Sequence, residues 1–287
     1  MARRLSYYPG CSLQGTAKEY DDSIRTVCGL LGFELEELDD WNCCGASSAH
    51  ITNDELAIGL GVRNLMIAQR AGLDVLVPCA ACFSRLKFAE KELLRDGSKW
   101  TDEPYRGEIS ILHLNDILVP PEILKTIAAK VTLPLSGLAV VPYYGCLTVR
   151  PPKVTDSEDW ENPTSMDRIL ETLGADVKSW SYKVDCCGGS FTMTRPDIVR
   201  RLSGKLLDMA VEAGAEALVT DCPMCQSNLD TRQGEIAAET GKDHNLPIFY
   251  ITELIALALG ESNTARWWKK HFVDPGGLLS SKGVLQP

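Results

Sequence analysis

Short apolar runs alternate along the chain with longer segments that have a helical pattern. The apolar runs predict strands at 5–8, 74–78, 138–144 and 217–220. The longer segments predict helices over 17–32, 53–71, 164–173 and 196–213. Strands that alternate with helices are typical of parallel sheets, so we expect an α/β fold with parallel strands.

The residues at the ends of these segments support the same interpretation. Gly32 lies where the first helix should stop, and Asn53 or Asp54 is placed to cap the second. A later apolar run leads directly into Cys79, and the next helix is expected to begin near Cys82. In parallel sheets ligands bind where strands end and helices begin. Most of the cysteines fall at such junctions, which makes them the first candidates for chemistry.

The chain carries one arrangement of five cysteines twice. The first set is Cys11, Cys43, Cys44, Cys79 and Cys82, and the second set is Cys146, Cys186, Cys187, Cys222 and Cys225. The last four members of the two sets are related by a constant shift of 143 residues, and the first members by 135. The sequence around the cysteines repeats as well, since YYPGC corresponds to PYYGC and CCGASSA to CCGGSFT. This repetition indicates an internal duplication.

The duplication divides the chain into three parts. The stretch 119–137, with VPP and LPLSG, is expected to join the two copies. We expect a first domain over 1–130, a second over 131–264 and a C-terminal arm over 265–287. The arm breaks the α/β pattern with a Trp-Trp-Lys-Lys segment followed by Pro-Gly-Gly. Because aromatic residues are common at interfaces, the arm either docks on a partner or packs back on its own domain.

Composition and charge exclude several classes of protein. Of 287 residues, 45% are hydrophobic and 24% are charged, which is ordinary for a soluble globular chain. A formal net charge of −10 argues against a nucleic-acid surface, which needs a basic stripe. The apolar runs are far shorter than the roughly 20 residues of a membrane span, and the N-terminus lacks the apolar region of a signal peptide. We therefore expect a cytoplasmic protein without direct membrane insertion, whose thiols stay reduced.

Five cysteines per copy, two of them adjacent, favour a metal cluster over a single ion. A structural zinc ion takes four ligands, usually as two close pairs. Neighbouring thiolates can instead bind different irons of one iron–sulfur cluster. Glycines after each pair (Gly45, Gly188 and Gly189) let the backbone approach the cluster sulfides closely. The ordinary ferredoxin spacing C-x2-C-x2-C-x3-C is absent, and zinc or redox-active thiols stay open as alternatives.

The doubled pattern C-x(31–39)-CCG-x(34)-C-x-x-C resembles the cysteine-rich CCG domain. Over residues 5–260 the chain resembles the B subunit of heterodisulfide reductase. The phrases that carry this resemblance are YYPGCSLQGTAKEY, DWNCCGASSAH, PCAACF, CLTVRPP, ENPTSMDRIL, DCCGGSFTMTRP and CPMCQSNLD. Both five-cysteine motifs are complete.

The resemblance implies one noncubane 4Fe–4S cluster in each domain, each held by one complete set of five cysteines. In the family, the mixed disulfide of coenzyme M and coenzyme B lies between the two clusters. Each cluster supplies one electron and captures one sulfur as the S–S bond breaks. Reducing a disulfide takes two electrons, which two equivalent one-electron centres can provide. The adjacent pairs Cys43, Cys44 and Cys186, Cys187 are therefore candidate catalytic residues as well as ligands.

The resemblance also implies partners. The chain has neither a Rossmann glycine fingerprint nor a ferredoxin motif, so electrons are expected from the ferredoxin-like C subunit and the flavin-containing A subunit of the same complex. Relatives in sulfur-oxidising and quinone-linked complexes would carry the same motifs, which leaves a different substrate open. A pure electron relay without substrate chemistry and a zinc-stabilised structural protein are further alternatives.

Some residues outside the cysteine sets are weaker candidates. His50 could donate a proton to a leaving thiolate or simply lie before the next helix, and Arg150 and Arg195 could bind an anionic group or be solvated. Cys28, which has no counterpart, is interpreted as a buried small hydrophobe. The serines Ser47, Ser48 and Ser190 could hydrogen-bond cluster sulfides, although turn serines need no such role.

Overall fold

The computed structural model describes residues 3–46 and 49–285. The first half contains β1 (Arg3–Tyr7), α1 (Gly10–Gln14), α2 (Lys18–Leu31), β2 (Phe33–Glu37), α3 (Ala49–Thr52), α4 (Asp54–Ala71), β3 (Val75–Leu76), α5 (Ala80–Asp96), η1 (Gly97–Lys99), β4 (Ile111–Leu112), α6 (Leu114–Leu118) and α7 (Pro121–Lys130). The second half contains β5 (Ala139–Tyr143), α8 (Pro152–Thr155), α9 (Ser165–Thr172), β6 (Asp176–Val177), η2 (Gly189–Phe191), α10 (Pro196–Glu212), β7 (Ala217–Thr220), α11 (Pro223–Thr231), α12 (Gln233–Thr240), β8 (Ile248–Tyr250), α13 (Ile251–Ala258), α14 (Ala265–Trp268) and α15 (Gly276–Ser281).

Each half builds a four-stranded parallel sheet of the same topology. The strand order is β2-β1-β3-β4 in the first sheet and β6-β5-β7-β8 in the second, and every pairing is parallel. The predicted duplicated α/β fold with parallel strands is thereby confirmed. The carboxyl ends of β1, β2 and β3 lead into the first cysteine set, and those of β5, β6 and β7 into the second.

The predicted strands are the central strands, and the strands that the sequence pattern misses are the edges. β1, β3, β5 and β7 correspond to the four apolar runs, whereas β2, β4, β6 and β8 each lie at the edge of a sheet. A central strand of a parallel sheet is buried on both faces and reads as a continuous apolar run. Edge strands are short or polar instead, as in the sequence FELEE of β2.

The four predicted helices are also present, with small shifts at their ends. Gly32 ends α2 in the left-handed conformation, with φ of 82°. Asn53 caps α4 by accepting a hydrogen bond from the Leu56 backbone N–H. The helix expected near Cys82 begins slightly earlier, because Cys79 is already the residue that precedes its first turn.

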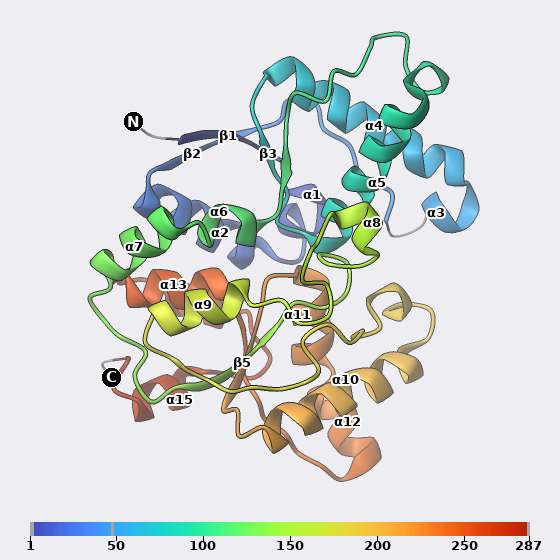
Figure 1. Ribbon diagram of the computed structural model, residues 1–287. Coiled ribbons are helices and arrows are strands. Elements are labelled where there is room, and N and C mark those ends of the chain that lie inside the picture. Colours follow the sequence, from blue (N-terminus) through green and yellow to red (C-terminus); the bar gives the residue numbers. More distant parts are fainter. Residues whose placement is uncertain (1–2, 47–48, 286–287) are drawn as a thin grey trace.

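The larger of two hydrophobic core clusters spans both halves, and the smaller lies almost entirely in the second half. Figure 1 shows α2, α6, α7, α9 and α13 in the middle of the molecule, between the strands of the two halves. Helix α2 of the first half packs against α13 of the second, while α6 and α7 pack against α9. Tyr20 of α2 stacks on Tyr250 with ring centroids 4.0 Å apart, and its hydroxyl donates to the Asp221 backbone oxygen at 2.7 Å. Each half is thus held in place by helices of the other.

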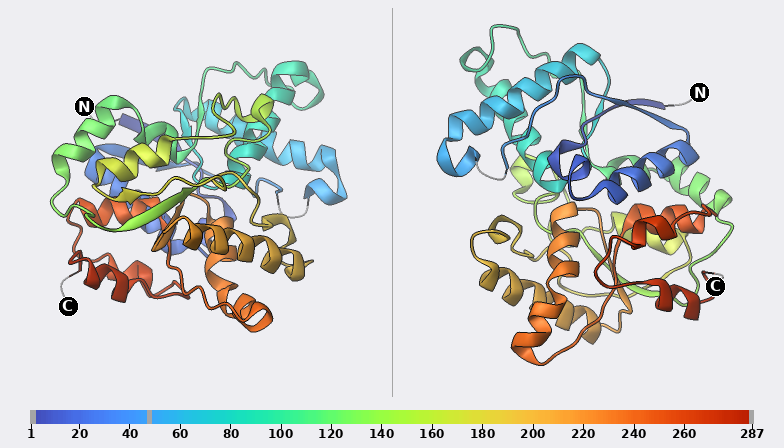
Figure 2. Two further views of the ribbon diagram at one scale, coloured as in Figure 1. Left: turned by 60° about the horizontal axis from the view of Figure 1, so that its bottom comes forward. Right: turned by 180° about the vertical axis from the view of Figure 1, so that it is seen from behind.

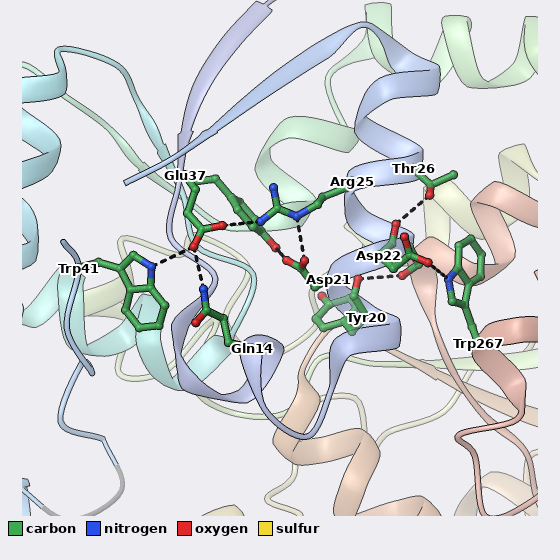
Figure 3. A network of polar contacts seen from close by, with 11 residues as sticks. Gln14, Tyr20, Asp21, Asp22, Arg25, Thr26, Glu37, Trp41 and Trp267 are labelled. Carbon is green, nitrogen blue, oxygen red and sulfur yellow. Dashed lines mark hydrogen bonds and ion pairs between the residues drawn. The ribbon is translucent and has the colours of Figure 1, made fainter. Parts of the chain in front are cut away.

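Helix α2 also joins the loop before the first cysteine pair to the C-terminal segment, residues 265–285. On one face Arg25 binds Glu37 at 2.7 Å, and Glu37 accepts a hydrogen bond from Trp41 at 3.1 Å (Figure 3). On another face Asp22 accepts a hydrogen bond from the Trp267 indole N–H at 2.7 Å. The view from behind in Figure 2 shows the red C-terminal helices beside the blue helix α2. The C-terminal segment therefore folds back on the body of the protein.

Within residues 3–46 and 49–285, no helix has both the length and the apolar character needed to span a bilayer.

The buried indole of Trp267 should make the C-terminal segment important for stability. Its side chain is 1% exposed, whereas Phe272 in the same segment is 75% exposed. We expect Trp267→Ala to lower the free energy of unfolding by about 3–5 kcal/mol, because a large cavity is left and the partly buried hydrogen bond to Asp22 is lost. Phe272→Ala is the control and should change it by less than about 0.5 kcal/mol. Urea unfolding followed by circular dichroism measures both, and equal small changes would show that the segment is not anchored.

Candidate functional site

The loops after the strands bring each set of cysteines together. In the first half, Cys11 lies in α1, the adjacent pair follows β2, and the remaining two flank the start of α5. The Sγ atoms of Cys44 and Cys82 are 3.1 Å apart, and those of Cys187 and Cys225 in the second half are 3.6 Å apart. All eleven cysteines are free thiols. Two sites of the same construction therefore result from the duplication.

Backbone N–H groups point at the sulfurs in both halves. The Gly45 N–H donates to Cys43 Sγ at 3.4 Å, and the Gly188 N–H donates to Cys186 Sγ at 3.3 Å. Such donors stabilise negative charge on a thiolate. The predicted role of the glycines after each pair is consistent with these contacts.

A buried tyrosine lies under each set of thiols. The Tyr8 hydroxyl donates to the Asn42 backbone oxygen at 2.8 Å, and the Tyr143 hydroxyl donates to the Asp185 backbone oxygen at 2.7 Å. Both acceptors directly precede a cysteine pair. Burial, together with charge on the neighbouring cysteines, raises the pKa of both phenols, so they stay protonated and act as donors. The sequence analysis missed this pair, although the repeat of YYPGC in PYYGC contains it.

Two glycines leave room for one thiol of each set. Gly10 has φ of +68°, and a Cβ at this position would lie 2.9 Å from Cys82 Sγ. Gly145 has φ of +64°, and its Cβ would lie 2.9 Å from Cys225 Sγ. Neither position tolerates a side chain without moving a sulfur, so the chain passes as close to the thiols as a backbone can.

Hydrogen bonds between neighbouring thiols lower the pKa of one partner and raise the pKa of the other. Hydrogen bonds from the thiols of Cys43 and Cys82 lower the pKa of Cys44 to about 3. A hydrogen bond from the thiol of Cys146 lowers the pKa of Cys186 to about 6. Thiolates are the form of cysteine that binds metals.

The arrangement of donors fits an iron–sulfur cluster in each half. Each half provides five thiols, a backbone N–H donor to one sulfur, a glycine beside another sulfur and a buried tyrosine. Within the described residues, no three or more His, Cys, Asp or Glu side chains converge on a single metal-ion position.

A cavity of about 130 Å³ lies against the second site and reaches the first half of the chain. It is lined by all five cysteines of the second set. Residues of the first half complete its wall: Ala46, His50, Ala80, Ala81, Ser84 and Arg85. Several of these neighbour cysteines of the first set, since Ala80 and Ala81 lie between Cys79 and Cys82. An adjoining cleft of about 290 Å³ shares His50 and Ser190 with the cavity.

Of the weaker candidate residues, His50 and Ser190 line the cavity, and Arg150 and Arg195 do not. His50 lies on the cavity wall, and its buried Nδ1 has no hydrogen-bond partner among the described residues. Ser190 lines the cavity as well. Arg195 is exposed and paired with Asp197 at 2.8 Å, and Arg150 stacks on Trp160 at 5.4 Å, so neither lines the cavity.

The remaining candidates lie away from the cavity or outside the described chain. Cys28 is 1% exposed in the core, and burial raises its pKa to about 12, which agrees with the interpretation as a buried hydrophobe. Ser47 and Ser48 lie outside the described residues.

The sequence analysis also missed Arg85, the arginine on the cavity wall. It belongs to α5, and its charge acts on Cys44 of the first set. The shift of 143 residues that relates the two copies places Asn228 at the equivalent position. The Asn228 amide lies 3.7 Å from Cys187 Sγ. One arginine among many on amphipathic helices gives no signal of its own, and only folding brings it to the cavity.

The fold and the two cysteine sets define a duplicated α/β protein with five free thiols in each half. The cysteine-rich domain family, CCG, matches residues 5–87 and 140–230. The chain belongs to this family, and it is homologous to the B subunit of heterodisulfide reductase. Both findings agree with the resemblance inferred from the motifs, and they support an iron–sulfur protein of the oxidoreductase class.

Two relatives illustrate the range of the homology. The 8-methylmenaquinol:fumarate reductase membrane anchor subunit of Wolinella succinogenes is 30% identical, over 91% of this chain and 93% of its own. The B subunit of a ferredoxin:CoB-CoM heterodisulfide reductase from Methanosarcina mazei is 28% identical, over 90% of each chain.

A solved structure supports the fold alone. A crystal structure of a hypothetical protein from Helicobacter pylori superposes with a TM-score of 0.75 at 12% identity. It covers 95% of this chain, which spans only 52% of that protein.

The glycine cradle can be tested by adding one methyl group. Gly145→Ala should lower the iron content of anaerobically purified protein, because the new Cβ displaces Cys225 Sγ. Gly214→Ala is the matched control, since Gly214 also has positive φ, +79°, but nothing lies within 4 Å of its Cβ. It should cost about 1 kcal/mol of stability and leave iron unchanged. Equal iron loss in both variants would mean that backbone strain, and not the cradle, causes it.

Proposed function

We propose that this chain is the disulfide-reducing component of a heterodisulfide-reductase-type complex. Its substrate is the mixed disulfide of coenzyme M and coenzyme B or an analogue. The overall reaction takes up two electrons and two protons, breaks one S–S bond and releases two thiols. The electrons come from a protein partner, because a disulfide supplies none.

The proposal includes two noncubane 4Fe–4S clusters. The first would be held by Cys11, Cys43, Cys44, Cys79 and Cys82, and the second by Cys146, Cys186, Cys187, Cys222 and Cys225. When bound, the clusters supply single electrons and iron sites with affinity for sulfur. The chain's own contribution is to hold the two sets of thiols on either side of one substrate.

The observation that carries the proposal is the composition of the cavity. All five cysteines of the second set line it, and the rest of its wall includes residues that flank the cysteines of the first set. A structural zinc site has all its coordination positions filled by protein ligands and needs no cavity beside it. A cavity that touches both cysteine-bearing regions is what a reaction shared between two sites requires.

His50 is the proposed proton donor for one leaving thiolate. It is a histidine on the cavity wall, and histidine is the side chain best suited to proton transfer near neutral pH. The shift that relates the copies places Met193 at the equivalent position, so only the first half provides a histidine as proton donor to a leaving thiolate. Cys43, Cys44, Cys186 and Cys187 are the proposed catalytic thiolates.

The proposed partners are the ferredoxin-like C subunit and the flavin-containing A subunit of a cytoplasmic complex. The homologous heterodisulfide reductase proteins are named as subunits, which supports at least one protein partner for this chain. We further propose that the domains run over 1–130 and 131–264, with 265–287 as a C-terminal arm.

A second function is favoured by one of the relatives. The relative that is 30% identical belongs to an 8-methylmenaquinol:fumarate reductase. By that analogy the chain would pass electrons within a quinone-linked complex and reduce no disulfide. Sulfur-oxidising assemblies are a variant of the same alternative.

Anaerobic turnover of the coenzyme M–coenzyme B disulfide tests the main proposal. Cluster-loaded protein is supplied with a reduced dye, which replaces the electron-donating partners. Oxidation of two dye equivalents, for a one-electron dye, per disulfide cleaved would support the proposal. Protein that carries iron and sulfide but turns over no disulfide would favour the electron-transfer alternative.

The role of the first cysteine pair can be tested separately. Cys43→Ser and Cys44→Ser should each reduce disulfide turnover at least about a hundredfold, while the spectroscopic signal of the second cluster persists, because each variant removes one ligand of the first site only. Cys28→Ser is the control and should keep full iron content, although it can lower stability. Unchanged turnover in either variant of the pair would contradict the assignment.

A further inference from the structure

Apart from its cysteines, the cavity beside the second site has a single side chain that carries a full charge. Among its lining residues Arg85 is the one lysine or arginine, and none is an aspartate or glutamate. The adjoining cleft is lined by neutral residues and His50. In a chain with a net charge of −10, this is an unusual place for an isolated cation.

Arg85 forms no ion pair with an aspartate or glutamate among the described residues, although Asp54 and Glu92 line a neighbouring hollow that Arg85 also borders. Its positive charge acts on the Cys44 thiol of the first set. The other arginine of that hollow, Arg95, is paired with Glu92. Arg85 is only partly buried, so its guanidinium keeps access to solvent and to a ligand.

The duplication shows that the charge is not needed to build a cysteine site. Asn228 occupies the equivalent position in the second half and donates weakly toward Cys187 with an uncharged amide. The two halves otherwise share their thiols, tyrosines and glycines. The arginine is therefore a property of the cavity and not of the ligand set.

We propose that Arg85 binds an anionic group of the substrate and thereby determines specificity. The group is a carboxylate, sulfonate or phosphate carried close to the reacting sulfur, because the cavity holds little more than a small polar fragment. A guanidinium recognises such groups through two parallel N–H···O bonds. This inference rests on the proposed function and adds the residue that selects the substrate.

Two small thiols with the same mercaptoethyl chain serve as probes, one ending in a charged sulfonate and the other in a neutral hydroxyl. The first is 2-mercaptoethanesulfonate and the second is 2-mercaptoethanol, each titrated calorimetrically into the cluster-loaded full-length chain. The wild type should bind the sulfonate at least about tenfold more tightly, the factor expected for a charge-assisted hydrogen bond. In Arg85→Gln this ratio should fall to near one, and Arg85→Lys should retain part of it.

Arg95→Gln is the matched control, because Arg95 lies on the same helix outside the cavity. It should leave the ratio unchanged. A readout that needs no variant is competition with inorganic sulfate, which should weaken binding of the sulfonate and not of the neutral thiol. An unchanged ratio in Arg85→Gln, or a wild type without preference, would overturn the proposal.

The outcome is separable from that of the proposed function. A preference for the sulfonate that depends on Arg85, in protein without disulfide turnover, would support the anion site and contradict the reductase activity. Disulfide turnover by the wild type, with a preference that is the same in Arg85→Gln, would support the reductase activity and contradict the anion site.

Discussion

Crowding of thiolates at the carboxyl ends of parallel strands is the constraint on which this protein depends. Sulfurs as close as 3.1 Å repel one another when ionised, and a bound cationic cluster is the natural compensation. Backbone N–H groups donate to sulfurs in both halves, and the glycines Gly10 and Gly145 leave space for the sulfurs of Cys82 and Cys225. The tyrosines Tyr8 and Tyr143 hold the loops that carry the pairs. Each half is thus built around its cysteines.

The second determinant is the shared core, which fixes one cysteine site relative to the other. Helix α2 packs against α13 across the interface, and the stacked pair of Tyr20 and Tyr250 is buried there. Because helices of each half complete the core of the other, the halves cannot move apart without exposing apolar surface. For the proposed reaction, this packing would hold the two cysteine sets at a constant separation.

The copies agree in the residues that surround the sulfurs and differ in those that face the cavity. His50 corresponds to Met193, and Arg85 corresponds to Asn228. Duplication therefore supplied two equivalent sets of five cysteines, and divergence made the residues of the cavity asymmetric. An asymmetric cavity is suited to a substrate whose two ends differ in charge.

The sequence by itself determined the duplication, the two cysteine sets and the central strands. These features are visible in the sequence, because the spacing of the cysteines and the continuous apolar runs of doubly buried strands are patterns in the order of residues. Only the tertiary structure decided which edge strands complete the sheets, that Arg85 and not Arg150 or Arg195 reaches the cavity, and that Trp267 folds back onto α2. Edge strands such as β2 are polar and short, so their pattern resembles a loop. The position of a charged side chain relative to a cavity depends on helix packing between segments far apart in the chain, which no local pattern encodes.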